Sequence, residues 1–554
     1  MISGSRFGRW LVGGVAAATA IMVVPPVFAQ QPPGAEPPGA DFFQERLQQE
    51  LERREERQRE GRRPSDEPVL IGPDPAGEGD LPETEDVFEL EAIEFSESAF
   101  LDEEVLRDIA DAYAGIPVDF AALNRMIGEV NALYADRGIL TGRAMIPPQR
   151  VDDGILQVQL VEGRLGALEM DGQQRLREPF ILNRIASMEP GEVVDVIALQ
   201  ESIAWLNRTQ DFRVAAALRA GSEPGETDVL LRVQEPPRYT AQLFTDNHGS
   251  ESTGEYRVGA NLAMYSPLGF GDRLSLLLLG TEGSDNISLG YQFPVNRRGG
   301  QLELRYTEGS IDIVEGPFRD LDVEGDSRVT ALTFSQPLMR RDTRWLDLTL
   351  RASRTESETK IQGLPLSDFT TDRANAGLRL TGFGDRSQWT VRQGVQYARL
   401  ENIQNESDTF WFLEGIGSYN TAFFDNALMT VRGGYQWTHD DAVPSPLLYQ
   451  VGGPASVRGY EEGAAGGASG YFLNLESRYL GFNRVSPFAF IDHGYVSDVS
   501  PSSETLISGG FGLGWEGPDW VTAEVMLGVP FRDVEPDQDS YRVEATISLS
   551  WSGG

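Results

Sequence analysis

From residue 237 to the C-terminus, apolar and polar residues alternate in run after run, and this alternation restricts the fold more than any other feature. For example, Leu346, Leu348 and Leu350 are separated by Asp347 and Thr349. A period of two places the two kinds of side chain on opposite faces of a β-strand. We count eleven such runs before a Gly-rich segment near residue 460 and five after it, sixteen in all. Both a membrane β-barrel and a soluble β-sandwich contain strands of this kind.

Two features favour the membrane β-barrel over the β-sandwich. An even number of antiparallel strands is typical of a closed bacterial barrel, and the runs leave about 20 residues for each strand with its connection. The apolar faces also end repeatedly in aromatic residues, which form girdles at membrane interfaces. These aromatic residues are Tyr291, Trp345, Trp389, Trp411, Trp437, Tyr479 and Trp551. We therefore predict a barrel of sixteen antiparallel strands over residues 237–554.

The first 29 residues predict export from the cytoplasm. Arg6 and Arg9 precede an apolar run over residues 11–24, and Ala29 ends a short segment that carries small residues. This pattern is typical of a secretory signal peptide with cleavage after Ala29. A membrane anchor is the alternative, but about 14 apolar residues are short for a bilayer core of about 30 Å. No other apolar run approaches 18 residues, so a bacterial periplasmic protein and an outer-membrane barrel both fit this pattern, since a barrel carries its lipid-facing side chains in alternation. With the predicted strands, we expect the barrel in the outer membrane and the N-terminal domains in the periplasm.

Composition and motifs exclude several classes of function. The formal net charge is -38, from 85 acidic and 47 basic residues, and such a surface repels nucleic acids. The chain has no cysteine, hence no thiolate metal site, and neither a nucleotide-binding P-loop nor an HExxH zinc motif is present. His493 follows Asp492 directly, but neighbouring residues of a strand face opposite sides. We predict no catalytic residues, enzyme activity, metal, cofactor, nucleotide or nucleic acid.

Residues 30–86 differ in amino-acid composition from the rest of the chain. Residues 30–63 contain a short Pro/Gly linker and then a segment, 41–63, in which acids and bases alternate at helical spacing without proline. This predicts a charged N-terminal helix with many i,i+4 pairs and little to bury. The helix is either solvated or placed in a polar cavity. Residues 64–86 are rich in proline, glycine and acids, which predicts a flexible linker.

Residues 87–236 predict two similar mixed units, 87–164 and 165–236. In the first, the periodicities indicate a strand, two helices and two strands, at residues 88–95, 102–113, 119–137, 143–146 and 155–162. The same order recurs in the second, at residues 168, 179–187, 196–207, 212–219 and 228–234. Two consecutive β-α-α-β-β units of about 75 residues each indicate an internal repeat.

The tetrapeptide Val457-Arg458-Gly459-Tyr460 lies in a Gly-rich loop, at about 440–470, between two alternating runs. An arginine beside a glycine in such a loop favours a tip that folds back into a barrel. An ordinary exposed loop is the alternative.

In this order of segments, the chain resembles the two-partner secretion transporters (TpsB proteins, of the ShlB/FhaC/HecB type) of the Omp85 superfamily. The two repeated units resemble POTRA domains. The first contains short segments that resemble the family's sequence motifs, namely Leu133-Tyr134-Ala135-Asp136-Arg137-Gly138, Pro147-Pro148-Gln149, Asp153-Gly154-Ile155-Leu156 and Val161-Glu162-Gly163-Arg164. The resemblance covers essentially the whole chain. It implies a translocase that binds an unfolded exoprotein through its POTRA domains and exports it through its barrel.

The resemblance also implies a site. In that family the arginine of a VRGY loop contacts an acidic residue on the inner wall, within a motif that corresponds here to Phe490, Asp492 and Gly494. It therefore implies a pair between Arg458 and Asp492. Gly459 would allow a tight turn, and Tyr460 would pack with a partner for its hydroxyl. The helix at 41–63 resembles the family's pore plug.

By resemblance, the partners are a secreted TpsA-like exoprotein of the adhesin or cytolysin class, outer-membrane lipid, and the assembly machinery that inserts barrels. Two other functions stay open at this point. One is an Omp85-type factor that assembles other outer-membrane proteins, and the other is a passive porin, for which two POTRA-like units have no use. The sequence does not identify the cargo or explain the acidity.

Overall fold

The computed structural model describes residues 70–71 and 87–553 apart from short gaps at 138, 140, 152–153, 186–187, 223–225, 317, 425, 441, 498–502, 519 and 535–537. The predicted signal peptide, the charged helix and nearly all of the linker before residue 87 lie outside the described residues. Within the described part of the chain, no helix is long and apolar enough to cross a membrane.

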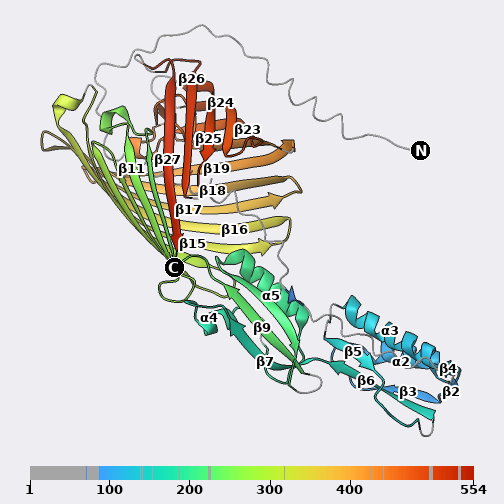
Figure 1. Ribbon diagram of the computed structural model, residues 1–554. Coiled ribbons are helices and arrows are strands. Elements are labelled where there is room, and N and C mark those ends of the chain that lie inside the picture. Colours follow the sequence, from blue (N-terminus) through green and yellow to red (C-terminus); the bar gives the residue numbers. More distant parts are fainter. Residues whose placement is uncertain are drawn as a thin grey trace, which may run out of the picture. The chain divides into compact units, whose positions relative to one another are not determined.

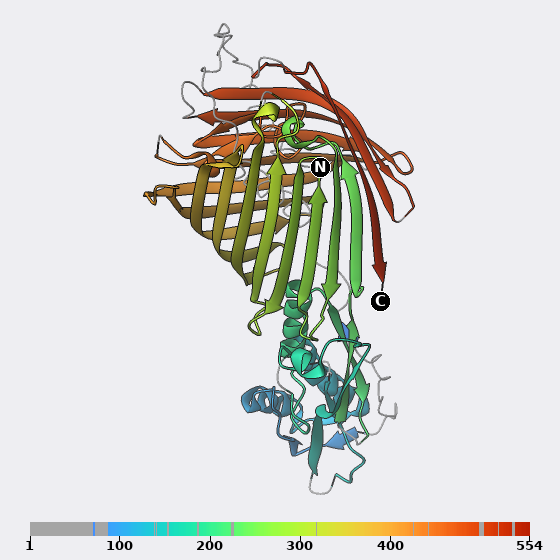
Figure 2. The same ribbon diagram turned by 90° about the vertical axis from the view of Figure 1, so that its left-hand side faces the viewer.

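A closed antiparallel barrel of sixteen strands forms the C-terminal part of the chain (Figures 1 and 2). Eleven strands precede the loop that carries Arg458 and five follow it, which confirms the predicted number. The first eleven are β10 Tyr239–Asp246, β11 Arg257–Tyr265, β12 Arg273–Gly280, β13 Ser284–Pro294, β14 Gln301–Asp312, β15 Val323–Arg340, β16 Arg344–Ile361, β17 Leu364–Phe383, β18 Ser387–Glu401, β19 Ser407–Phe424 and β20 Ala427–Trp437. The last five are β23 Ser469–Tyr479, β24 Val485–Ser497, β25 Glu504–Glu516, β26 Val521–Pro530 and β27 Arg542–Gly553.

The barrel closes because its last strand pairs with its first. The register between β27 and β10 runs from Gly553 opposite Tyr239 to Thr546 opposite Asp246. Short 3-10 helices lie in two of the connections, η2 Glu251–Thr253 and η3 Arg319–Leu321.

The alternation sorts the side chains between the two faces of the barrel wall. Leu304, Leu332 and Leu350 are exposed on the outer face, and so are four of the predicted girdle residues, Trp411, Trp437, Tyr479 and Trp551. Trp345 was predicted wrongly as a girdle residue. It lines an inner cavity together with Asp347 and Thr349, because residues two apart on a strand share a face.

The first mixed unit differs from the predicted order of elements in two places: its first strand is divided in two, and an additional short strand lies between its two helices. Its elements are β2 Val87–Glu89, β3 Ala92–Phe95, α2 Glu103–Tyr113, β4 Pro117–Asp119, α3 Phe120–Asp136, β5 Gly142–Met145 and β6 Ile155–Glu162. The strand predicted over 88–95 is interrupted because Leu90 turns into the core, 2% exposed, and its carbonyl accepts a hydrogen bond from the Gly115 N–H at 2.8 Å. β2 therefore pairs with β4, whereas β3 pairs with β6.

The helix α3 shows why the sequence folds locally in this way. The Asp119 side chain accepts a hydrogen bond from the Ala122 N–H at 2.7 Å and so caps the first turn. Met126, Val130 and Tyr134, each four residues apart, are fully buried on one face of the helix.

The second mixed unit consists of β7 Arg164–Asp171, α4 Glu178–Leu182, α5 Val196–Thr209, β8 Arg213–Ala220 and β9 Glu226–Gln234. α4 is shorter than the predicted 179–187, because the Arg184 and Ile185 N–H groups bond to carbonyls three residues back and tighten the last turn. A short strand from the linker, β1 Leu70–Ile71, adds in parallel to the edge strand β8, so the sheet order is β1-β8-β9-β7. Sequence reasoning did not predict β1.

Candidate functional site

The loop between β20 and β23, residues 438–468, folds inward against the barrel wall. It contains η4 Ser445–Leu447 and a small hairpin of β21 Tyr449–Val451 and β22 Ala465–Gly467. Val457 is completely buried and Tyr460 is 1% exposed; both pack with inward-facing residues of β23, β24 and β25. The tetrapeptide is therefore part of the interior rather than an exposed turn.

Arg458 binds Asp492 of β24 through three hydrogen bonds. Its Nε lies 2.7 Å from Oδ2, its Nη2 lies 2.9 Å from Oδ1, and its backbone N–H donates to Oδ2 at 3.1 Å. Asp492 is fully buried and Arg458 is 9% exposed. A bidentate pair of this kind fixes the orientation of both groups, so the loop tip is held to one place on the wall.

The other two residues of the wall motif have distinct physical roles. The Arg458 guanidinium lies over the Phe490 ring, with Cζ 3.7 Å from the ring centroid, which is a cation–π contact. At Gly494, an added Cβ would lie 2.7 Å from Cγ2 of Val457. Phe490 thus supports the arginine from below, and Gly494 leaves the space that Val457 fills.

Gly459 makes the closest approach between the loop and the wall. Its φ is +88°, and an added Cβ would lie 2.9 Å from the carbonyl carbon of Gly528 on β26. Its N–H donates to Oε1 of Glu544 on β27 at 3.5 Å. Only glycine meets both the backbone angle and the available space.

Tyr460 anchors the other side of the loop tip. Its hydroxyl lies 2.8 Å from the Arg532 carbonyl and 3.0 Å from the Ile507 carbonyl, and it accepts a hydrogen bond from the Ile507 N–H at 3.1 Å. One buried hydroxyl therefore links the loop to β25 and to the connection after β26.

Sequence reasoning missed a second carboxylate at this site. Glu476 of β23 binds Nη1 of Arg458 at 2.6 Å, and it also binds Arg478, which in turn contacts Glu524 of β26 at 2.9 Å. Arg478 lies over the Phe488 ring at 4.1 Å, so an arginine over a phenylalanine occurs twice, two residues apart along β24. The parity of β23 could have placed Glu476 on the inner face, but only the register between β23 and β24 sets it opposite Phe490.

A further contact of the loop was also missed. Glu461 Oε1 accepts hydrogen bonds from the Ser250 hydroxyl at 2.9 Å and the Glu251 N–H at 3.0 Å. Glu462 lies 3.8 Å from Arg257, which is held by Asp246 at 2.7 Å. These contacts tie the loop to the first strands of the barrel as well as to the last ones.

His493 is separated from the acidic centre, as its strand parity predicted. Its ring stacks on Tyr471 with centroids 5.5 Å apart, whereas Asp492 points to the opposite face of β24. Nothing in this arrangement forms a nucleophile and base pair.

Comparison with known protein families gives two matches. Haemolysin secretion/activation protein ShlB/FhaC/HecB matches residues 225–517, which is more than half of the chain. The chain belongs to the ShlB/FhaC/HecB family. The POTRA domain of ShlB type matches residues 88–163, the first of the two mixed units. The predicted family and fold class are thereby confirmed.

Individual relatives in this family are transporters. Heme/hemopexin transporter protein HuxB of Haemophilus influenzae is 22% identical over 402 residues, which cover 68% of this chain and 69% of that protein. Outer membrane transporter CdiB of Dickeya dadantii is 23% identical over 474 residues, 80% of this chain and 83% of that protein.

Solved structures show the same fold. CdiB from Escherichia coli has a TM-score of 0.65 at 21% identity and covers 93% of this chain and 100% of that chain. BamA from Haemophilus ducreyi, lacking POTRA domains 1–3, has a TM-score of 0.54 at 13% identity and covers 84% of this chain and 100% of that chain. The protein is a two-partner secretion transporter of the outer membrane, with its POTRA domains in the periplasm.

Proposed function

We propose that this transporter exports a TpsA-like exoprotein of the adhesin or cytolysin class, and that the contact between Arg458 and Asp492 locks the inward loop in the resting state. The single observation that supports the lock is the three hydrogen bonds from one loop residue to one buried wall carboxylate. The domain limits predicted above, with residues 165–236 as a second POTRA domain, are part of this proposal.

The lock is expected to be strong because its carboxylate is buried. Removing one partner of a buried ion pair typically costs about 3–5 kcal/mol, since it leaves an uncompensated charge. A polypeptide that crosses the barrel has to pass the residues of the loop, so the loop must rearrange and Arg458 must exchange or lose its contacts. Glu476 is already bound to Arg458, so it offers a carboxylate that can keep the arginine paired while Asp492 is released.

We also propose, from the sequence alone, that the charged helix at 41–63 is a plug for the pore. Deleting residues 41–63 should raise the single-channel conductance of the purified transporter in a planar bilayer. An unchanged conductance would remove this part of the proposal.

Deletion of the gene, followed by comparison of the culture medium and the outer membrane, tests the export function. We expect one large β-rich protein to disappear from the medium and to return on complementation, while the barrels of the outer membrane stay unchanged. A general loss of outer-membrane barrels would instead support the Omp85-type assembly factor, whose fold is represented by BamA.

A further inference from the structure

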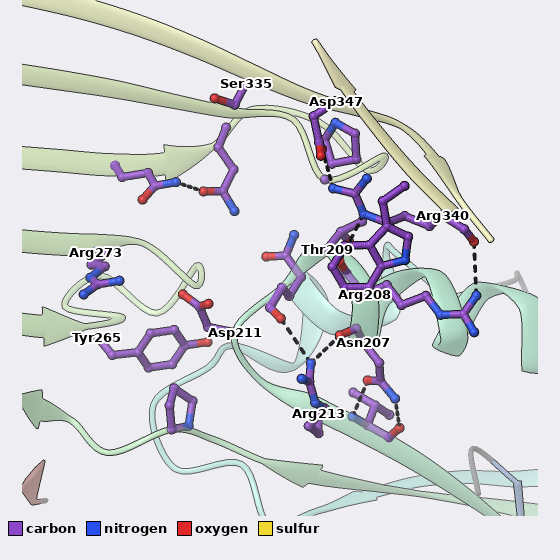
Figure 3. Close-up of a pocket in the computed structure, with 18 of the residues that line it drawn as sticks. Asn207, Arg208, Thr209, Asp211, Arg213, Tyr265, Arg273, Ser335, Arg340 and Asp347 are labelled. Atoms are coloured by element: carbon purple, nitrogen blue, oxygen red, sulfur yellow. Dashed lines mark hydrogen bonds and ion pairs between the residues drawn. The ribbon is translucent and has the colours of Figure 1, made fainter. Parts of the chain in front are cut away.

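A cavity of about 830 Å³ opens where the second mixed unit meets the inner face of the barrel (Figure 3). Its lining comes from the end of α5, the start of β8 and the end of β9. The opposite side consists of inward-facing residues near the periplasmic ends of β10 to β18. Arg208 of α5 forms hydrogen bonds across this junction, because it binds Asp342 and the Arg340 carbonyl. A polypeptide that enters the barrel from the periplasm would meet this cavity before the locked loop.

The charge of the lining is opposite to that of the whole chain. The formal net charge of the protein is -38, but six arginines and only two aspartates line the cavity. The arginines are Arg208, Arg213, Arg232, Arg273, Arg340 and Arg379. A concentrated charge of one sign in a recessed site focuses the electric field and attracts groups of the other sign.

Part of this positive charge is available to a ligand. Arg340 is bound to Asp347, and carbonyls of Asn207 and Gln210 hold Arg213. Among the residues that the structure describes, no hydrogen bond or ion pair is assigned to the guanidinium groups of Arg232 and Arg273.

Buried donors in the lining also have no acceptor. Gln210 and Tyr265 are each 7% exposed, and both Nε2 of Gln210 and the Tyr265 hydroxyl have no hydrogen-bond partner within the described part of the chain. The indole N–H of Trp345 likewise has no hydrogen-bond partner in the described part of the chain, and an indole can only donate. The cavity therefore lacks hydrogen-bond acceptors as well as negative charge. Buried donors without acceptors destabilise the folded state, and a ligand that supplies acceptors would remove this cost.

We propose that this cavity binds an acidic, extended segment of the exported polypeptide as it enters the barrel. Carboxylates of such a segment pair with Arg232 and Arg273, and its backbone carbonyls accept from Gln210, Tyr265 and Trp345. The volume matches ligand sites that take a short stretch of chain rather than a single ion. This inference rests on the proposed export function, to which it adds a charge preference at the entrance.

Binding of defined peptides to the full-length transporter in detergent tests the proposal. The chain has no cysteine, so Ser335→Cys places a single environment-sensitive fluorophore in the lining. Hexaglutamate, hexaglutamine and hexalysine are then titrated. We expect hexaglutamate to bind at least about tenfold more tightly than hexaglutamine. The reason is that each charge-assisted hydrogen bond lowers the dissociation constant by about a factor of ten. The preference should weaken with added salt.

The combined variant Arg232→Gln and Arg273→Gln should remove this preference. The matched control is Arg354→Gln, an arginine on the outer face whose partner is Asp372, and it should retain the preference. Equal binding of hexaglutamate and hexaglutamine, or a preference that survives in the double variant, overturns the proposal.

Failure of this proposal can be distinguished from failure of the export function. If gene deletion removes a secreted protein but the cavity shows no preference for hexaglutamate, only the inference on the entrance is wrong. If gene deletion removes no secreted protein, the export function fails, and with it the assignment of the peptide to a cargo.

Discussion

Arg458 and Asp492 are joined by both the side chain and the backbone of the arginine, with Nε at 2.7 Å, Nη2 at 2.9 Å and the backbone N–H at 3.1 Å from the carboxylate. The outer face of the barrel carries a similar bidentate pair, Arg354 with Asp372, at 2.7 and 2.8 Å. The two pairs differ in environment, because Asp492 is fully buried while both side chains of the outer pair are exposed. The protein thus contains its own comparison between a buried and an exposed ion pair.

Arg458→Ala should abolish export while the barrel still inserts. The change leaves the Asp492 carboxylate buried without its arginine, which typically costs about 3–5 kcal/mol, and the loop tip loses its fixed position. Export is measured by the amount of partner protein in the medium, and insertion by heat-modifiable migration of the barrel.

The control for this prediction is Arg354→Ala, which should leave export unchanged because exposed pairs contribute at most about 1 kcal/mol. Normal export by Arg458→Ala would show that the loop contact has no part in the mechanism.

Gly459→Ala should reduce export more strongly than Gly466→Ala in the same loop. An added Cβ at Gly459 meets the backbone of Gly528 at 2.9 Å and forces a residue with a side chain to a φ of +88°, whereas at Gly466 its nearest neighbour is a Leu448 side-chain atom at 3.7 Å. Left-handed backbone alone costs about 1–2 kcal/mol for such a residue. Protease accessibility of the loop, measured beside export, should rise only for Gly459→Ala. Similar behaviour of the two variants would contradict this account of the close approach.

Glu476→Gln should impair export less than Asp492→Asn. Arg458 keeps its bidentate contact with Asp492 when Glu476 is neutralised, whereas Asp492→Asn removes the charge and replaces one of the two acceptor oxygens by an NH2 group, so only the ionic contact from Nη1 to Glu476 remains. A double-mutant cycle with Arg458→Ala measures the coupling between Glu476 and Arg458. It is read as the free energy of unfolding of the barrel, because Arg458→Ala abolishes export, and we expect about 1–3 kcal/mol for a charged hydrogen bond. Additive effects of the two changes would show that Glu476 does not act through Arg458.

The stability of the second mixed unit should fall in acid through Glu235. Burial raises the pKa of this carboxyl, but the N–H groups of Gln174, Arg175 and Leu176 and the Arg175 charge outweigh burial, so the folded pKa lies below its ordinary value near 4.5. A depressed pKa contributes stability that is present above the unfolded value and is lost as the pH falls toward the folded one.

Hydrogen exchange of the backbone amides in 164–176, corrected for intrinsic rates, measures this effect between about pH 7 and pH 4. Glu235→Gln should lower protection at neutral pH and remove most of the pH dependence, whereas Glu169→Gln, at an exposed position of β7, should behave as the parent. Unchanged protection of the parent in acid would refute the prediction.

In the two mixed units, the periodicity of apolar residues was sufficient to predict the long helices but not the pairing of the short strands. The helix α3 was predicted within one residue at each end, because Asp119 caps it and its apolar residues recur every three to four positions. The division of β2 from β3 depends on Leu90 entering the core and on two different pairing partners. The addition of β1 to β8 is a contact between segments far apart in sequence. Local patterns do not encode such pairings.

For the barrel and its site, the sequence by itself determined the number of strands, the loop that carries Arg458 and the face on which Asp492 lies. A period of two is a local property that needs no knowledge of the neighbouring strand. The tertiary structure alone decided that Glu476 shares the arginine, that Gly528 meets Gly459, and that Glu461 and Glu462 reach the first strands. These contacts depend on the register between strands and on the inward path of the loop, which arise only when segments distant in the chain pack together.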